Sequence, residues 1–407
     1  MNRSKLGRRG GECSVILGIV VLFVAYINTG WPDLFEYWNV PIMKPAFADL
    51  RTITHGADAA AIGVDPMIEN NFDPWSRRLN YPRVWQLLYP LGVNKSHTET
   101  LGFLLVVLYF GGMLLVFRGM KLWWSPVLIL FVLAPAGMLA IERGNIDIAV
   151  FFILCLAAVL YTRNRRNSAA VAILLTVMLK IYPVFSIGIM NWKDGRDRVY
   201  LILLLIASIC YFALIYEDLT LIARNTPAPD SLSYGISVIT IKFGKHFPEM
   251  YTLAKIIAYA GVGSMLLGSL WCIKRGRAIS SRSENRDVLF IIGSSIYIGT
   301  FLLGANFDYR LIFLAFVLPN LLTLLTFDRL AFRLYGMVML ALILITTWYL
   351  ILRNYMDAYF VGPLASTIVD EVAHWLLFGG LLFRLLSMYW QVDSTRGFRG
   401  DSERKIA

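Results

Sequence analysis

Charged and polar side chains gather in one long segment between the first two apolar blocks of the chain. Residues 31–98 contain acidic, basic and imidazole groups: Asp49, Arg51, His55, Asp58, Asp65, Glu69, Asp73, Arg77, Arg78 and Arg83. Carboxylates and imidazoles are the side chains that most often move protons, and arginine binds phosphate or carboxylate oxygens in pairs. A connection this long is more often functional than filler. Most of its acidic residues are nevertheless expected only to contact solvent.

Three further cations lie within or beside apolar sequence. Lys180 lies inside the apolar run 168–191, Arg143 in a short polar stretch, and Arg310 just before another apolar run. A lysine at membrane depth is a candidate functional residue because leaving it unpaired is costly. We therefore rank Lys180 above Arg310, and Arg310 above Arg143.

Each arginine also has a purely structural interpretation. Arg310 has Asp308 as a close neighbour in the sequence, and Arg143 has Glu142 and Asp147. Simple ion pairs with these acids would occupy both guanidinium groups.

The elements that must position these residues are membrane helices. The 407-residue chain is 57% hydrophobic and only 16% charged, whereas soluble domains carry about a quarter charged residues. Its apolar residues fall in blocks long enough to cross a bilayer core of about 30 Å. These blocks are Ser14–Gly30, Leu101–Phe117, Ser125–Ile141, Tyr200–Tyr216, Leu253–Trp271, Val288–Leu303, Leu311–Phe327, Leu334–Leu352 and Val372–Trp390. We predict an all-α, polytopic bundle of about ten spans, forming a single domain over 1–407.

Basic residues set the expected orientation. The net charge of +11 comes from short Lys/Arg clusters between apolar blocks, a pattern that holds loops in the cytoplasm and does not indicate nucleic-acid binding. Both termini, including the tail 391–407, are therefore predicted to be cytoplasmic. The segments 31–98 and 217–250 are predicted to face outward. Within the first, Leu34–Trp38 and Val84–Tyr89 are predicted to be short interfacial helices.

One segment breaks this alternation. Residues 168–191 lie between two basic clusters that both belong inside, so we predict a re-entrant or broken hairpin bent near Lys180–Pro183. Such backbone is tolerated at membrane depth only where protein buries it or it lines a wet cavity. The twelve residues before Lys180 would rise about 18 Å, past the midplane. The alternative is an ordinary span whose outer loop happens to be basic.

A series of short motifs then resembles a known family. The motifs are Pro45–Arg51 with Asp49, Gly63-Val-Asp65-Pro66, Asn80-Tyr81-Pro82, Glu142-Arg143-Gly144-Asn145, Leu179-Lys180-Ile181-Tyr182-Pro183, Asn225–Gly235 and Asn306-Phe307-Asp308-Tyr309-Arg310. In this order and on one membrane face, they are similar to the superfamily C glycosyltransferases. The closest group is the polyprenol-phosphate-mannose-dependent mannosyltransferases. The chain departs from that pattern at Met67 and Arg83.

The resemblance implies an enzyme that moves a sugar, mannose above all, from a polyprenyl-phosphate donor to a hydroxyl of a glycan or glycolipid. It implies Asp49 as the base, with Lys180, Arg310 and Arg143 holding the donor phosphate. The same resemblance implies substrate-binding roles for these residues: Arg51, Asp65, Asn145, Tyr182 and Asp308.

The sequence is compatible with this chemistry on one independent point. It has no Gly-rich nucleotide fingerprint, and an outer-face transferase needs a donor carried by the membrane itself. The leaving phosphate needs cations rather than a second carboxylic acid.

No cofactor is expected. The four histidines are scattered and no Asp-x-Asp pair occurs in the segment 31–98, so we predict metal-independent transfer. No cysteine falls in an outer segment, so no disulfide framework is predicted.

Two other classes of function stay open. One is a transporter or flippase of a lipid-linked glycan, since transporters also use broken helices with charged residues at depth. The other is a polymerase or ligase of surface glycans. A bacterial plasma membrane is favoured over the endoplasmic reticulum.

Overall fold

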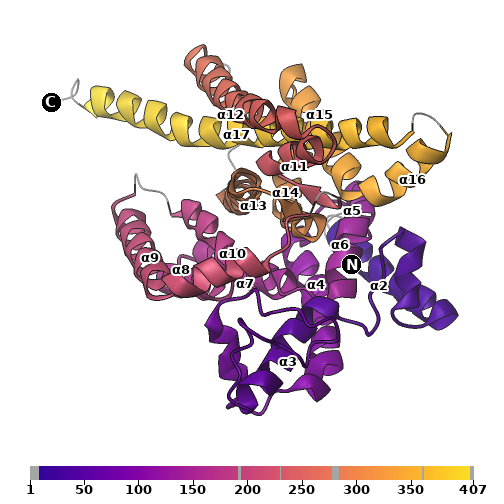
Figure 1. Cartoon of the computed structure of the whole chain (residues 1–407). Coiled ribbons are helices and arrows are strands. Elements are labelled where there is room, and N and C mark those ends of the chain that lie inside the picture. Colours follow the sequence, from indigo (N-terminus) through magenta and orange to yellow (C-terminus); the bar gives the residue numbers. More distant parts are fainter. Residues whose placement is uncertain (1–8, 191–193, 230, 277–283, 360–361, 404–407) are drawn as a thin grey trace, which may run out of the picture.

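The computed structural model describes residues 9–190, 194–229, 231–276, 284–359 and 362–403. Within these ranges the chain is almost entirely helical (Figure 1). The α-helices are α2 (Gly10–Thr29), α3 (Ala48–Ala61), α4 (Thr98–Phe117), α5 (Ser125–Val132), α6 (Pro135–Arg143), α7 (Asp147–Thr162), α8 (Arg166–Leu179), α9 (Gly195–Leu214), α10 (Tyr216–Asn225), α11 (Ile236–His246), α12 (Tyr251–Lys274), α13 (Glu284–Leu303), α14 (Leu318–Leu324), α15 (Leu330–Thr347), α16 (Tyr349–Tyr359) and α17 (Gly362–Glu403). The predicted all-α class is confirmed.

Short 3-10 helices and one small strand pair complete the fold. The 3-10 helices are η1 (Asp33–Trp38), η2 (Arg83–Leu88), η3 (Lys95–His97), η4 (Leu122–Trp124), η5 (Tyr182–Ile189), η6 (Pro248–Met250) and η7 (Asp308–Phe316). The strands β1 (Ser233–Tyr234) and β2 (Asn306–Phe307) pair antiparallel.

Seven helices are long and apolar enough to cross a membrane in the described part of the chain, or eight if the bent pair α5–α6 counts as one span. This makes a multi-pass membrane protein, although the count is below the predicted ten. The seven lie in α2, α4, α9, α12, α13, α15 and α17. Only 17% of the apolar stretch of α9 or α12 is buried, against 61% for α13, so α13 is central and the other two face outward.

The apolar block Leu311–Phe327 is not a single span, contrary to the prediction. It folds as η7 followed by α14, with Pro319 at the start of α14. Nearly all of its side chains are buried in protein. Apolar composition alone cannot distinguish a segment buried in protein from one buried in lipid.

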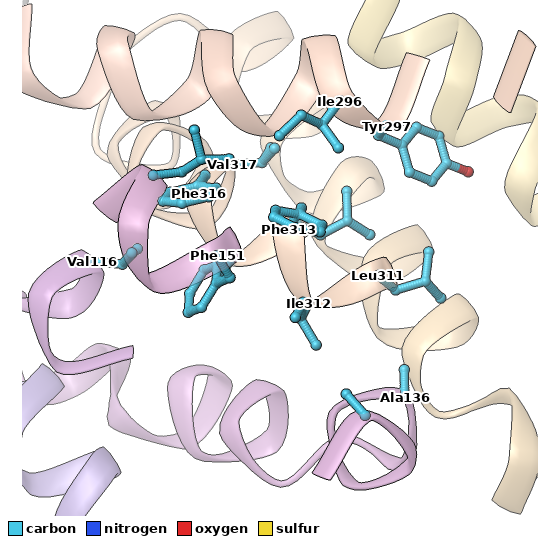
Figure 2. Close-up of a cluster of buried hydrophobic side chains, with 14 of the residues drawn as sticks. Val116, Ala136, Phe151, Ile296, Tyr297, Leu311, Ile312, Phe313, Phe316 and Val317 are labelled. Atoms are coloured by element: carbon cyan, nitrogen blue, oxygen red, sulfur yellow. The ribbon is translucent and has the colours of Figure 1, made fainter. Parts of the chain in front are cut away.

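A hydrophobic core fixes η7 against the other central helices. Figure 2 shows Phe313 and Phe316 of η7 beside Phe151 of α7, with Ile296 of α13 nearby. The ring centroids of Phe151 and Phe316 are 5.0 Å apart, and all these side chains are buried. Because η7 begins at Asp308, this packing fixes the position of Arg310 relative to α7.

The long segment 31–98 is more ordered than the sequence indicated. Short 3-10 helices occur at η1 and η2, close to the predicted Leu34–Trp38 and Val84–Tyr89. The sequence reading missed α3, a 14-residue helix that places Asp49 in its first turn. In Figure 1, α3 lies in the lower part of the molecule, and α17 crosses the upper part.

Helical structure is interrupted near Lys180, where the bend of the hairpin was predicted. Helix α8 ends at Leu179, Lys180 adopts an extended conformation (φ −149°, ψ 145°), and η5 starts at Tyr182. Residues 191–193, at the end of the predicted hairpin, lie outside the described residues. At the other end of the chain, α17 continues to Glu403, so the segment expected as a tail is largely helical.

Candidate functional site

A polar cavity of about 890 Å³ lies where α3, α6, η5, α10 and η7 meet. Asp49, Lys180, Tyr182, Arg310 and Arg143 all line it, although they come from four distant parts of the sequence. The predicted base and the predicted phosphate-binding cations therefore share one space. Their roles stay predictions.

Asp49 is held at the start of α3. Phe47, the residue that caps this helix, has a left-handed backbone (φ 59°), and its ring packs against Trp31 and Phe103. The Asp49 carboxylate accepts a hydrogen bond from Asn145 Nδ2 (2.6 Å) and lies 3.5 Å from the guanidinium of Arg77. Its side chain is 21% exposed, so the carboxylate is anchored and still reachable from the cavity.

Asn145 connects the base to the cations. Its amide donates to Asp49, and its Oδ1 accepts from Lys180 Nζ (3.1 Å) and from the backbone N–H of Asp147 (2.9 Å). The tight turn before it needs Gly144, whose φ is +59° and whose missing Cβ would lie 2.9 Å from Phe47 Cβ. One carboxamide thus fixes the separation of the predicted base from the predicted phosphate site.

Asp147 is the centre of the cation site, and the sequence reading did not assign it a role there. Its buried Oδ1 accepts hydrogen bonds from Lys180 Nζ and Tyr182 Oη (2.7 Å), and its Oδ2 lies 3.3 Å from Arg310 Nε. Asp147 is fully buried. A buried carboxylate that attracts two cations holds them together against their mutual repulsion.

Lys180 is nearly buried and surrounded by aromatic rings. Its ammonium lies 5.1 Å from the ring centre of Tyr81 and 5.8 Å from that of Tyr309. Ring faces attract cations, most strongly where water is excluded. Two cations share one carboxylate here, so the pair has charge left over for an anion in the cavity.

Arg310 does not pair with Asp308, the partner that its sequence neighbourhood offered. It donates to Asn306 Oδ1, approaches Asp147, and lies over the ring of Tyr182 at 4.6 Å. Asp308 itself is buried and faces a different group of residues.

No protein-family model matches the chain, and a search of curated proteins found no match. The family resemblance of the motifs therefore stays a prediction, and the site is interpreted from its own geometry.

Arg143 lines the cavity but is paired, as the structural interpretation proposed. Its guanidinium donates to Glu142, whose other oxygen accepts from the backbone N–H of Met43 (2.8 Å). Its charge is locally neutralised, which supports its lowest rank among the three cations.

Arg51 and Asp65 do not line the cavity. The guanidinium of Arg51 donates to Ala46 O (2.8 Å) and contacts His55, and burial lowers the pKa of Arg51. Asp65 forms an ion pair with Arg83 (2.8 Å), which also donates to Asp218 of α10 (2.6 Å). Both side chains therefore bond within segment 31–98 and do not reach the cavity.

Asp308 belongs to a second polar cluster, which we call the Glu371 cluster. Its members are Lys242, Tyr297, Asp308, Asp370, Glu371 and His374. Burial raises the pKa of Asp308 to about 8, and the nearby Asp370 carboxylate acts in the same direction. The backbone N–H of Asp308 donates to Leu232 O (2.9 Å), so the residue anchors the strand pair instead of contacting the cavity.

Among the described residues, no group of three or more His, Cys, Asp or Glu side chains is arranged to hold a metal ion. The predicted metal independence of the reaction stays untested. Three cavity-lining arginines were not predicted as site residues: Arg77, Arg78 and Arg224. The surplus of basic residues in segment 31–98 could have drawn attention to the first two. Nothing local in the sequence distinguishes Arg224.

Proposed function

We propose that this protein is a membrane glycosyltransferase that moves a sugar from a polyprenyl-phosphate donor to a hydroxyl of a glycan or glycolipid on the non-cytoplasmic face. The observation that carries the proposal is the shared cavity of Asp49, Lys180 and Arg310. The Asn145 side chain bonds both Asp49 and Lys180, so the proposed base lies beside the cation pair. Displacement of a lipid phosphate needs both: a base that takes the acceptor proton, and cations that bind the leaving phosphate. Mannose is the proposed sugar, by the family resemblance.

The proposed step is an inverting, in-line displacement. The acceptor oxygen forms a bond to the anomeric carbon while the bond from that carbon to the phosphate oxygen breaks. Asp49 takes the acceptor proton, and the electron pair leaves with the lipid phosphate. Lys180 and Arg310 stabilise the charge that develops on the phosphate. No general acid is needed, because the phosphate leaves as a stable anion.

An apolar groove of about 590 Å³ supports a lipid donor. It lies between α2 and α4 and is lined by Leu22, Phe110 and Trp31, among other residues. At its end the Trp31 ring contacts Phe47, which caps the helix that carries Asp49. We assign the isoprenoid chain of the donor to this groove.

We further propose the topology that the basic clusters indicate. Both termini lie in the cytoplasm of a bacterial plasma membrane, and α3 with its flanking segments lies on the outer face. The short apolar helices α7 and α8 add to the spanning bundle, with the break at Lys180 at membrane depth. Cysteine labelling at Glu69 and at Arg163 from either side checks this orientation.

A transporter or flippase is the alternative that a specific observation favours. The α5–α6 pair is bent by 49°, and α8 ends beside a buried lysine, both of which occur in transporters. A flippase would move a lipid-linked sugar from one leaflet of a proteoliposome membrane to the other and leave the bond between sugar and lipid phosphate intact.

The deciding experiment is a transfer assay in proteoliposomes. The donors are synthetic polyprenyl phosphates bearing mannose, arabinose or glucose, and mass spectrometry detects the product. Asp49→Asn is expected to reduce transfer about a hundred- to ten-thousandfold. Glu69→Gln, an exposed carboxylate of the same segment, is the matched control and retains wild-type transfer.

Thermal unfolding of each variant accompanies the assay. No transfer from any donor, or equal transfer by wild type and a folded Asp49→Asn variant, contradicts the proposal.

A further inference from the structure

The cavity as a whole has more positive charge than the proposed donor needs. The basic residues that line it are Arg77, Arg78, Arg143, Lys180, Arg224 and Arg310, and the acidic residue that lines it is Asp49. Three carboxylates behind the wall also pair with lining cations: Asp73, Glu142 and Asp147. Six cations therefore face four carboxylates, an excess of two. A sugar phosphodiester donor brings one negative charge.

The unbalanced cations are Arg78 and Arg224. Neither forms an ion pair with any described residue, and both are exposed. The other four lining cations each have a carboxylate within 3.5 Å. Lys180 and Arg310 share Asp147 and keep one unit of charge for the donor phosphate. The charge on Arg78 and Arg224 is therefore additional and lies at the rim.

The fold brings together the two segments that carry these arginines. Asn225, the neighbour of Arg224, donates hydrogen bonds to Leu79 O (3.1 Å) and Met67 O (2.9 Å), and Leu79 is the neighbour of Arg78. The Asn225 side chain thus fastens α10 to the segment that carries Arg78, and both arginines line the same cavity. Like charges brought together without an acid repel each other, and a bound anion removes that cost.

The ordinary interpretation is that each is a solvated surface arginine. Arg224, in the last turn of α10, also interacts favourably with the end of its own helix. That interpretation explains one residue alone. It does not explain why two unpaired guanidinium groups from different elements border the same cavity.

We propose that Arg78 and Arg224 form a second anion site, which binds a negatively charged group, a phosphate or a carboxylate, on the acceptor. The assignment to the acceptor rests on the proposed transferase function, in which Lys180 and Arg310 hold the donor phosphate on other elements. The acceptor class is therefore an anionic glycan or glycolipid.

The test measures equilibrium binding in phosphatidylcholine nanodiscs, so it does not depend on sugar transfer. The probes are octyl glucoside and octyl glucoside 6-phosphate, which differ only in the charged group. Wild type is expected to bind the phosphorylated probe at least about tenfold more tightly than the unphosphorylated one. Salt at about 0.5 M is expected to weaken this preference. Arg78→Gln/Arg224→Gln loses the preference.

The matched control is Arg163→Gln/Arg165→Gln, which removes two exposed arginines at the far end of α7, about 24 Å along that helix from Asp147. This control retains the preference. Lys180→Met also retains it if the rim is the site. Equal binding of both probes by wild type overturns the inference. So does a preference that survives the rim substitutions but is lost in Lys180→Met.

Two further measurements distinguish an anion on the acceptor from an anionic lipid headgroup. If phosphatidylglycerol in the nanodisc abolishes the preference, the rim binds membrane headgroups, and the acceptor assignment is wrong. In the transfer assay, the rim substitutions are expected to raise KM for an anionic acceptor about tenfold, with kcat and the KM of a neutral acceptor unchanged. A transferase with equal KM effects on both acceptors overturns this inference but leaves the proposed function intact.

Discussion

Two buried polar clusters occupy the centre of this protein, and they differ in charge and in access. The Asp147 cluster, made of Asp49, Asn145, Asp147, Lys180, Tyr182 and Arg310, opens into the large cavity. None of the Glu371 cluster lines that cavity. The first pairs two cations with one buried carboxylate, whereas the second is rich in acids.

The difference separates a binding arrangement from a structural one. In the Glu371 cluster each cation has its own acid: Lys242 donates to Glu371 (2.7 Å), and His374 lies 3.4 Å from Asp370. Lys180 and Arg310, by contrast, must share Asp147. A shared carboxylate leaves cation charge available on the side that faces the cavity, and a ligand anion can use it.

The largest expected effect compares the central acids of the two clusters. Asp147→Asn leaves Lys180 and Arg310 buried without their counter-ion. We expect the free energy of unfolding to fall by about 3–5 kcal/mol, as when one partner of a buried ion pair is removed. Asp308→Asn should cost little, because burial already favours the uncharged form of this carboxyl. Thermal unfolding in nanodiscs measures both. Equal destabilisation would contradict the distinction between the clusters.

The second prediction compares the two lysines. Lys180→Met is expected to lower the transfer rate about a hundred- to a thousandfold, because it removes charge from the leaving phosphate. Lys242→Met, the matched variant in the Glu371 cluster, is expected to lower stability and leave the rate of the folded protein unchanged. If both variants lose the same activity, the cavity cation has no special role.

A smaller effect concerns pH. An ordinary Asp in the unfolded chain has a pKa near 4, whereas burial raises that of folded Asp308 to about 8. Between these values the unfolded chain releases the proton that the folded protein keeps, so stability falls as pH rises. We expect wild type to lose about 2 kcal/mol relative to Asp308→Asn between pH 6 and pH 8. Unfolding temperatures of the two proteins from pH 5 to pH 9 check this, and a constant difference would rule it out.

The smallest predicted effect is at Arg143. Because Glu142 neutralises its guanidinium, Arg143→Gln should lower transfer less than about tenfold. Steady-state rates with saturating donor measure it. A loss as large as that of Lys180→Met would show that Arg143 contacts the phosphate directly.

The sequence predicted those features of the fold that depend on local composition. Long apolar blocks identified the spans, and Pro183 marked the break after Lys180. It failed for α3, an alanine-rich helix whose only large aliphatic residues are Leu50 and Ile53, and for Leu311–Phe327, which is buried in protein. Local pattern does not reveal what surrounds a segment.

The candidate site divides in a similar way. Lys180 was identifiable because a lysine within apolar sequence is unusual at any position. The role of Asp147 was not, because its partners Lys180 and Arg310 are far away in the sequence and meet it only through packing of α8 and η7 on α7. Asp308 illustrates the opposite error, since its place beside Arg310 in the sequence implied a contact that the fold does not make.

The strand pair of Ser233–Tyr234 with Asn306–Phe307 has a consequence for how this protein can diversify. Its bonds join main-chain atoms, and Gly235 approaches so closely that a Cβ there would lie 1.7 Å from Gly304 O. Phe307, which lines the cavity, can therefore be exchanged without breaking the pair, whereas Asn306 also holds Arg310 through its side chain. New substrate preferences can therefore arise around the cavity mouth while the reactive centre keeps its geometry.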